Sequence, residues 1–171
     1  MSAQLDAISA LHAPVQRLCA AFLDAFPGSA IASGRRGVDD QARADAELCA
    51  EARRRTGRSY ANTISATYVA SPVRDAMVRC GATYYMADAE ALASAFAFVL
   101  GSFDDAALSH FSLHLSGNAV DFEPVGDPRR EEWCREWVAR CPGLDLDRSR
   151  VLTVEAGLPR LHVQLVERSS T

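Results

Sequence analysis

Apolar residues recur at helical spacing through the first 26 positions of the chain. They stand three or four residues apart, which places them on one face of an α-helix. The residues concerned are Leu5, Ile8, Leu11, Val15, Leu18, Cys19, Phe22 and Phe26. Pro14 is expected to end or kink a first segment, and Pro27-Gly28 is expected to end the helix. The pattern predicts an N-terminal helix over residues 3–26.

Further helices are predicted where capping residues precede stretches rich in helix formers. Asp39 or Asp40 can begin a helix that runs to about Arg55, and Gly57 follows as a C-cap. Additional helices are expected over residues 71–81, 88–100, 104–110 and 127–141. Residues 58–70 are rich in Ser, Thr, Tyr and Ala, and their pattern predicts neither helix nor strand.

Four short segments have the composition or alternation of β-strands. They cover residues 30–33, 118–125, 151–155 and 160–167, the last two forming a hairpin around residues 156–159. In the last strand, His162 and Gln164 share one face, and the apolar residues beside them share the other.

The order of these elements indicates an α+β fold. The last three strands are close in sequence and are expected to pair antiparallel. The strands carrying Asp121 and His162 are expected to be neighbours. We therefore predict a small antiparallel β-sheet with helices packed on one face, namely those at 3–26, 40–55 and 88–100.

Length and composition narrow the class of protein. The chain has 171 residues, of which 49% are hydrophobic, which fits one domain over 1–171 with a core at about 28–167. A net charge of -4 argues against nucleic acid as a partner. No run of 18 apolar residues occurs, which argues against membrane insertion. Five cysteines without CxxC spacing are expected to be free thiols in a reducing cytosol.

A possible metal site lies in the segment from Ser112 to Asp121. It places His114 just before a turn at Gly117 and Asp121 on the strand that follows. Imidazole and carboxylate groups are the donors that zinc prefers. Gly117 is expected to relieve crowding where the backbone approaches the metal. His162, in a late apolar strand, is either a further imidazole donor or a core or edge histidine without a ligand.

These residues resemble a known family. The sequence SxHxxGxAxD, present here at Ser112, His114, Gly117, Ala119 and Asp121, is the signature of the D-Ala-D-Ala carboxypeptidase-like zinc peptidases. The chain also carries the SGxRxxxxQ element of that family at residues 33–41, and a histidine in a late strand. The three elements occur in the family's order and span residues 33–164. The resemblance implies the hedgehog/DD-peptidase fold.

The resemblance also implies roles for individual residues. His114, Asp121 and His162 would bind Zn²⁺ with water as fourth ligand. Arg36 would hold a substrate carboxylate or the developing oxyanion, with Arg35 as the alternative. Gln41 would hold the turn or contact substrate. Ser112 would hydrogen-bond within the ligand turn or bind substrate.

The chain departs from the family pattern at the general base. The family carries Glu or Asp three residues before the last histidine ligand, or His two residues before it. Here Pro159 and Arg160 occupy those positions. Glu155, across the expected hairpin turn, is the first candidate for the base, and His110 is the second.

The function implied is zinc-dependent hydrolysis of amide bonds in the stem peptides of peptidoglycan. Substrates in this family are short and often contain D-amino acids. The N-terminus has no basic n-region, so no signal peptide is expected. A cytoplasmic product would then reach the cell wall through a virion, a holin or a secretion machine. The alternatives are a catalytically inactive member serving as a virion structural or wall-binding module, and an intracellular dipeptidase.

Overall fold

The computed structural model describes residues 8–155 and 158–168. Their contacts divide the chain into two compact units. The first unit combines residues 8–35, 116–155 and 159–168, and the second centres on residues 36–115. Each unit has its own cluster of buried apolar side chains.

The first unit contains a four-stranded antiparallel sheet. Its strands are β1 (Ala30–Ser33), β2 (Ala119–Glu123), β3 (Arg150–Glu155) and β4 (Leu158–Gln164), in the order β1-β2-β4-β3. The α+β class and the pairing of β2 with β4 are confirmed. Strand β4 begins two residues earlier than expected, so the connection between β3 and β4 is shorter than predicted. Residues 156–157 of that connection lie outside the described part of the chain.

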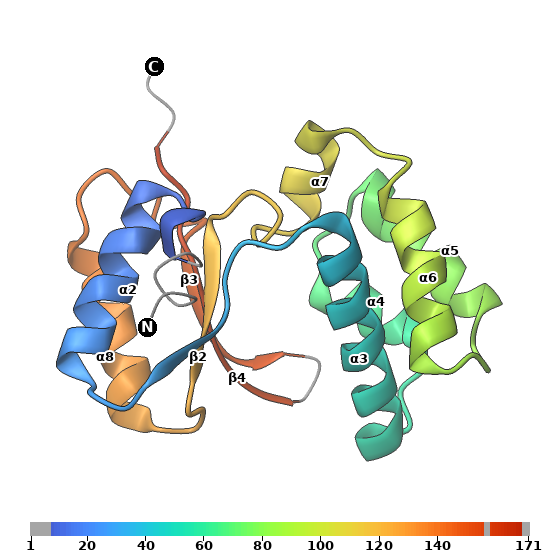
Figure 1. Ribbon diagram of the computed structural model, residues 1–171, viewed down its shortest axis with the longest axis horizontal. Coiled ribbons are helices and arrows are strands. Elements are labelled where there is room, and N and C mark those ends of the chain that lie inside the picture. The colour runs from blue at the N-terminus through green and yellow to red at the C-terminus, as the bar shows by residue number, and fades with distance from the viewer. Residues whose placement is uncertain (1–7, 156–157, 169–171) are drawn as a thin grey trace. The chain divides into compact units, whose positions relative to one another are not determined.

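Two helices of the first unit pack on the sheet, α2 (Ala13–Ala25) and α8 (Pro128–Arg140). Figure 1 shows both on the same side of the strands. Phe22 of α2 stacks on Phe122 of β2 with ring centroids 4.0 Å apart. Pro14 lies in the first turn of α2, where its missing N–H costs no helical hydrogen bond. Residues 8–9 are also helical, but residues 10–12 are not, so the helix predicted over 3–26 is interrupted just before Pro14, as expected, and α2 begins at Ala13. Residues 3–7 lie outside the described part.

The second unit is helical. Its helices are α3 (Val38–Thr56), α4 (Tyr60–Thr67), α5 (Pro72–Thr83), α6 (Ala89–Leu100) and α7 (Asp105–Phe111). The side chains of Ser59, Ser71, Asp88 and Asp104 cap four of them by accepting a backbone N–H hydrogen bond. Helix α4 lies in the segment for which the sequence pattern predicted no element.

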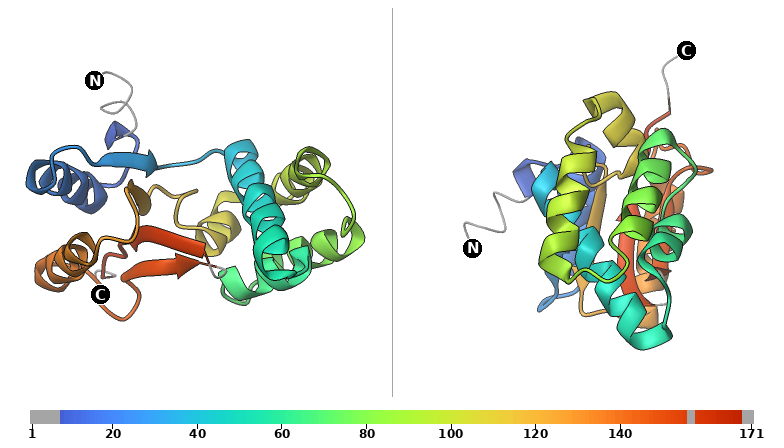
Figure 2. Two further views of the ribbon diagram at one scale, coloured as in Figure 1. Left: turned by 90° about the horizontal axis from the view of Figure 1, so that it is seen from below. Right: turned by 90° about the vertical axis from the view of Figure 1, so that its right-hand side faces the viewer.

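One prediction about this second unit is wrong. Helices 40–55 and 88–100 were expected to cover the sheet. Instead, α3 and α6 pack on each other, α3 also packs on α4, and α6 also packs on α5, while α7 packs on α5. These helices are drawn from teal to yellow in Figure 2. Alanines on α3 allow this close packing, since Ala42 and Ala46 are fully buried against larger residues such as Phe96. The helices therefore satisfy their apolar faces within their own bundle.

No helix among the described residues combines the length and the apolar character needed to cross a membrane. The five cysteines are free thiols, as expected. Burial raises the pKa of Cys19 and of Cys134 to about 12, and it raises the pKa of Cys49 as well. Cys80 and Cys141 are half-buried.

Thiol alkylation tests this core. At pH 8 a thiol of pKa 12 is ionised to about one part in 10⁴, and the thiolate is the nucleophile. Iodoacetamide should therefore modify Cys80 and Cys141 well before Cys19 and Cys134 in the native protein, as read by peptide mass spectrometry. Because the pKa of these thiols is higher in the folded state than in the unfolded state, they do not lower the free energy of unfolding below about pH 8.5. They lower it as the pH rises from there toward 12. Labelling of Cys19 at equal rates with and without urea would contradict the packing.

Candidate metal centre

Two of the predicted ligands face each other across neighbouring strands. Asp121 of β2 is the register partner of His162 of β4. Val120 and Val163, their neighbours in sequence, point to the opposite face and are buried in the apolar core. The alternation predicted for the last strand is therefore confirmed. The Nδ1 atom of His162 lies 2.8 Å from Oδ1 of Asp121, with both side chains largely shielded from solvent.

This hydrogen bond constrains the histidine. An ionised carboxylate can only accept, so Nδ1 of His162 carries the proton. In the neutral imidazole the lone pair is then on Nε2, the atom that can take a metal or a proton. If His162 bound an ion through Nδ1 while Asp121 bound the same ion, the hydrogen bond between the two side chains would have to break.

The third ligand lies in the turn between α7 and β2. His114 is buried, and its carbonyl oxygen accepts a 3.1 Å hydrogen bond from the backbone N–H of Arg36. Gly117 follows at φ +75°, a left-handed conformation that favours glycine. A Cβ atom on Gly117 would lie 3.1 Å from the carbonyl oxygen of Ala10. The close approach at Gly117 is therefore that of the N-terminal segment, rather than the approach to a metal that we expected.

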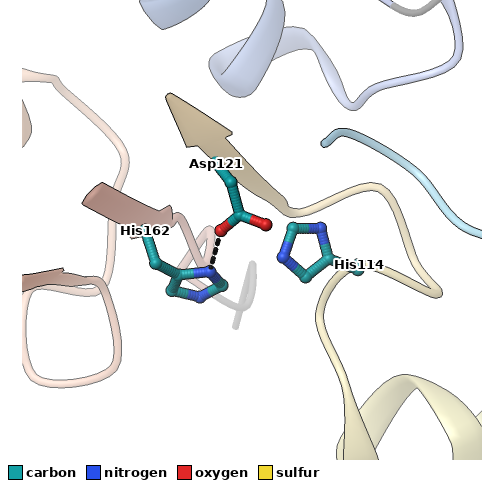
Figure 3. A group of neighbouring side chains, drawn as sticks. All are labelled: His114, Asp121 and His162. Atoms are coloured by element: carbon teal, nitrogen blue, oxygen red, sulfur yellow. Dashed lines mark hydrogen bonds and ion pairs between the residues drawn. The ribbon is translucent and has the colours of Figure 1, made fainter. Parts of the chain in front are cut away.

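The three predicted ligands converge. One donor atom each from His114, Asp121 and His162 can be chosen so that all lie within 4.8 Å of one another. Figure 3 shows the three side chains pointing toward one another. The group could hold a metal ion.

The donor set fits zinc in number and kind. Two imidazoles and one carboxylate leave the fourth tetrahedral position open, as in catalytic zinc sites. Zinc bonds of about 2.1 Å at tetrahedral angles place donors about 3.4 Å apart. The donor atoms of the three side chains lie within 4.8 Å of one another, compared with this spacing of about 3.4 Å.

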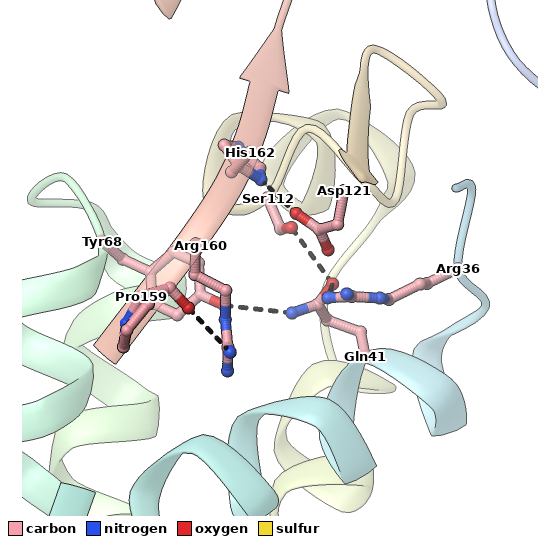
Figure 4. A network of polar contacts seen from close by, with 8 residues as sticks. All are labelled: Arg36, Gln41, Tyr68, Ser112, Asp121, Pro159, Arg160 and His162. Atoms are coloured by element: carbon pink, nitrogen blue, oxygen red, sulfur yellow. Dashed lines mark hydrogen bonds and ion pairs between the residues drawn. The ribbon is translucent and has the colours of Figure 1, made fainter. Parts of the chain in front are cut away.

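A buried polar network supports the turn that carries His114 (Figure 4). Gln41, on the first turn of α3, is fully buried. Its Oε1 atom accepts a 3.1 Å hydrogen bond from the hydroxyl of Ser112, and Nη1 of Arg36 lies 3.5 Å from the same oxygen. Gln41 thus connects two parts of the family pattern. It belongs to the SGxRxxxxQ element together with Arg36, and it is bonded to Ser112 of the SxHxxGxAxD signature.

Two residues that the sequence analysis missed determine the orientation of Gln41. Its Nε2 atom donates to Oδ1 of Asp45 at 2.9 Å and to the hydroxyl of Tyr68 at 3.0 Å. The Tyr68 hydroxyl in turn donates to the same Asp45 oxygen at 2.5 Å. Because the carboxylate only accepts, it selects the amide nitrogen and turns Oε1 toward Ser112. Gln41 and Asp45 lie four residues apart on one helix, and this spacing in the sequence could have predicted their contact.

The two arginine candidates differ in their surroundings. Arg36 is half-buried and bound through its backbone to His114 and through its guanidinium to Gln41. Arg35 is exposed, and its side chain lies near Gly117. Arg36 is thus attached to the segment that carries a predicted ligand, which suits the role expected for it.

The candidates for the general base remain predictions. Pro159 is exposed, and Nη1 of Arg160 donates to the Pro159 carbonyl oxygen at 3.3 Å. A guanidinium stays protonated and cannot accept a proton. Glu155 ends β3, but its side chain lies outside the described part of the structure. His110 is exposed on α7.

Comparison with protein-family models, with curated proteins and with solved structures finds no match for this chain. The likeness to zinc peptidases therefore rests on the motif residues themselves.

The network around Asp45 yields a stability prediction. Asp45→Asn keeps the shape of the side chain but removes the charge that selects the amide nitrogen of Gln41. We expect the free energy of unfolding in urea to fall by about 1.5–3 kcal/mol, the range for buried hydrogen bonds to a charged group. Asp40→Asn, on the exposed face of the same helix, should change it by less than about 0.5 kcal/mol. Equal effects of the two substitutions would contradict the role of Asp45.

Proposed function

We propose that this chain is a zinc-dependent peptidase that cleaves amide bonds in peptidoglycan stem peptides. The observation that carries the proposal is the convergence of His114, Asp121 and His162. These residues come from a turn and two strands. His114 and Asp121 are positions of the family's signature, and His162 is the late-strand histidine that accompanies it in the family. Motif and geometry are independent lines of support, since the pairing of β2 with β4 is not part of the motif.

The ion would supply the electrophile. When bound, zinc polarises a scissile carbonyl and lowers the pKa of a water molecule toward about 7. His114, Asp121 and His162 would hold it. The chain's other residues would bind and orient the peptide.

Arg36 is the residue that we assign to substrate binding. A guanidinium pairs with a carboxylate through two parallel hydrogen bonds, and it also stabilises a developing oxyanion. The hydrogen bond from its backbone to His114 ties its position to a predicted ligand. The Ser112 hydroxyl donates a hydrogen bond to Oε1 of Gln41, so we assign Ser112 to holding the ligand turn.

A second function is favoured by one specific observation. Pro159 and Arg160 stand where the resembling family carries its base, and neither can accept a proton. A chain that keeps the metal ligands and lacks a base would bind wall peptides without cleaving them. Such a chain would serve as a virion structural or wall-binding module. Delivery in a virion or by a secretion machine is compatible with both functions.

Metal binding and murein digestion test the proposal together. Purified protein should contain one zinc per chain by mass spectrometry, and it should solubilise purified murein in a chelator-sensitive manner. His114→Ala should abolish both properties because it removes a ligand. His12→Ala, at the N-terminus of α2, is the matched control and should retain them. Zinc retained by His114→Ala would refute the site, whereas zinc without digestion would favour the binding module.

The identity of the base is tested separately. If Glu155 accepts the proton, Glu155→Gln should lower the rate of murein digestion by about two to four orders of magnitude. The zinc content should stay unchanged, because Glu155 is not among the proposed ligands. An unchanged rate would show that another group is the base, and His110→Ala would then be measured.

A further inference from the structure

The first unit contains a hollow beside α2 and α8 that the proposed peptidase does not use. It has a volume of about 300 Å³. Both tryptophans of the chain, Trp133 and Trp137, line it together with Cys141. Arg17 of α2 and the pair Glu136 and Arg140 of α8 supply its charged groups.

The aromatic wall is held in place by the core. Trp133 and Trp137 lie one helical turn apart on α8, so both indoles face the same side of the helix. Trp133 packs edge to face against Phe22 and Phe26, with ring centroids 5.7 and 5.8 Å apart. Both indoles are nevertheless only half-buried. The hollow therefore offers a flat apolar surface that is fixed before any ligand arrives.

The charges around this surface favour an anion. Glu136 is paired with Arg140, whose Nη2 atom lies 2.7 Å from Oε2. Their charges offset each other, so the charged residues that line the hollow carry one net positive charge, that of Arg17. Among the described residues, Arg17 has no hydrogen bond or ion pair. A cationic ligand, which indole faces can also attract, would be repelled by the excess positive charge of Arg17.

The size of the hollow favours a small molecule. A volume of 300 Å³ is at the lower end of the range of ligand pockets. A stable protein interface covers about 800 Å² on each partner, far more than two indoles provide. We propose that this hollow binds a small cyclic carboxylate, with its ring on Trp133 and Trp137 and its carboxylate on Arg17.

The two tryptophans make this site directly observable. The indole N–H groups give two resonances in a ¹H–¹⁵N spectrum, which Trp133→Phe and Trp137→Phe assign. Addition of 2-naphthoate should shift both resonances in a saturable manner. The uncharged analogue 2-naphthalenemethanol has the same ring and should bind more weakly, because it lacks the carboxylate.

Substitution of Arg17 tests the charge. Arg17→Gln should weaken the binding of 2-naphthoate about fivefold, as expected for a partly exposed ion pair, and should leave the alcohol unchanged. Arg129→Gln, an exposed position on α8 outside the hollow, should have no effect. No saturable shift up to about 10 mM ligand would overturn the proposal. Equal binding of acid and alcohol, or equal effects of the two substitutions, would overturn it as well. These outcomes are independent of zinc and of murein digestion.

Discussion

The antiparallel pairing of β2 with β4 is the constraint on which the candidate metal centre depends. It makes Asp121 and His162 direct cross-strand partners, so that their side chains emerge on the same face. A slip of one residue would send one of them into the apolar core. The core prevents that slip, because Val120 and Val163 fill the opposite face against α2 and α8. The hydrophobic effect thus fixes the register, and the register positions two of the three candidate ligands.

The third ligand is positioned by polar contacts instead. His114 lies in a turn, where no ladder of backbone hydrogen bonds determines its place. The backbone N–H of Arg36 and the side chain of Gln41 provide the anchors, the latter through Ser112. Asp45 stabilises this arrangement by fixing which end of the Gln41 amide faces the turn. Burying the charge of Asp45 in a helical bundle costs free energy, and the hydrogen bonds that Gln41 and Tyr68 donate to it help to offset that cost.

Local patterns predicted most elements but not their grouping. Strand β1 and helix α6 follow from turn residues and caps, and the face of His162 follows from alternation. Helix α4 was missed because its Ser and Thr residues have weak helix propensity, although Ser59 caps it. The bundle of α3 and α6 could not be foreseen, since amphipathic helices show an apolar face without showing what covers it.

The same distinction applies to the site. The candidate ligands were predictable because His114 and Asp121 belong to the signature and His162 is a late-strand histidine. Gln41 was predictable because it belongs to the SGxRxxxxQ element. Asp45 and Tyr68 were not, because their contact joins residues 23 positions apart through tertiary structure. The general base was not predictable in the same way, because Pro159 and Arg160 stand at the positions where the family pattern would name it.

The central claim is that one ion binds to His114, Asp121 and His162 together. Anomalous diffraction at the zinc absorption edge from crystals grown with zinc tests it most directly. The account predicts one strong peak about 2.0–2.2 Å from a nitrogen of each histidine and from an oxygen of Asp121. A peak elsewhere, or a zinc ion held by the histidines while Asp121 keeps only its hydrogen bond to His162, would contradict it.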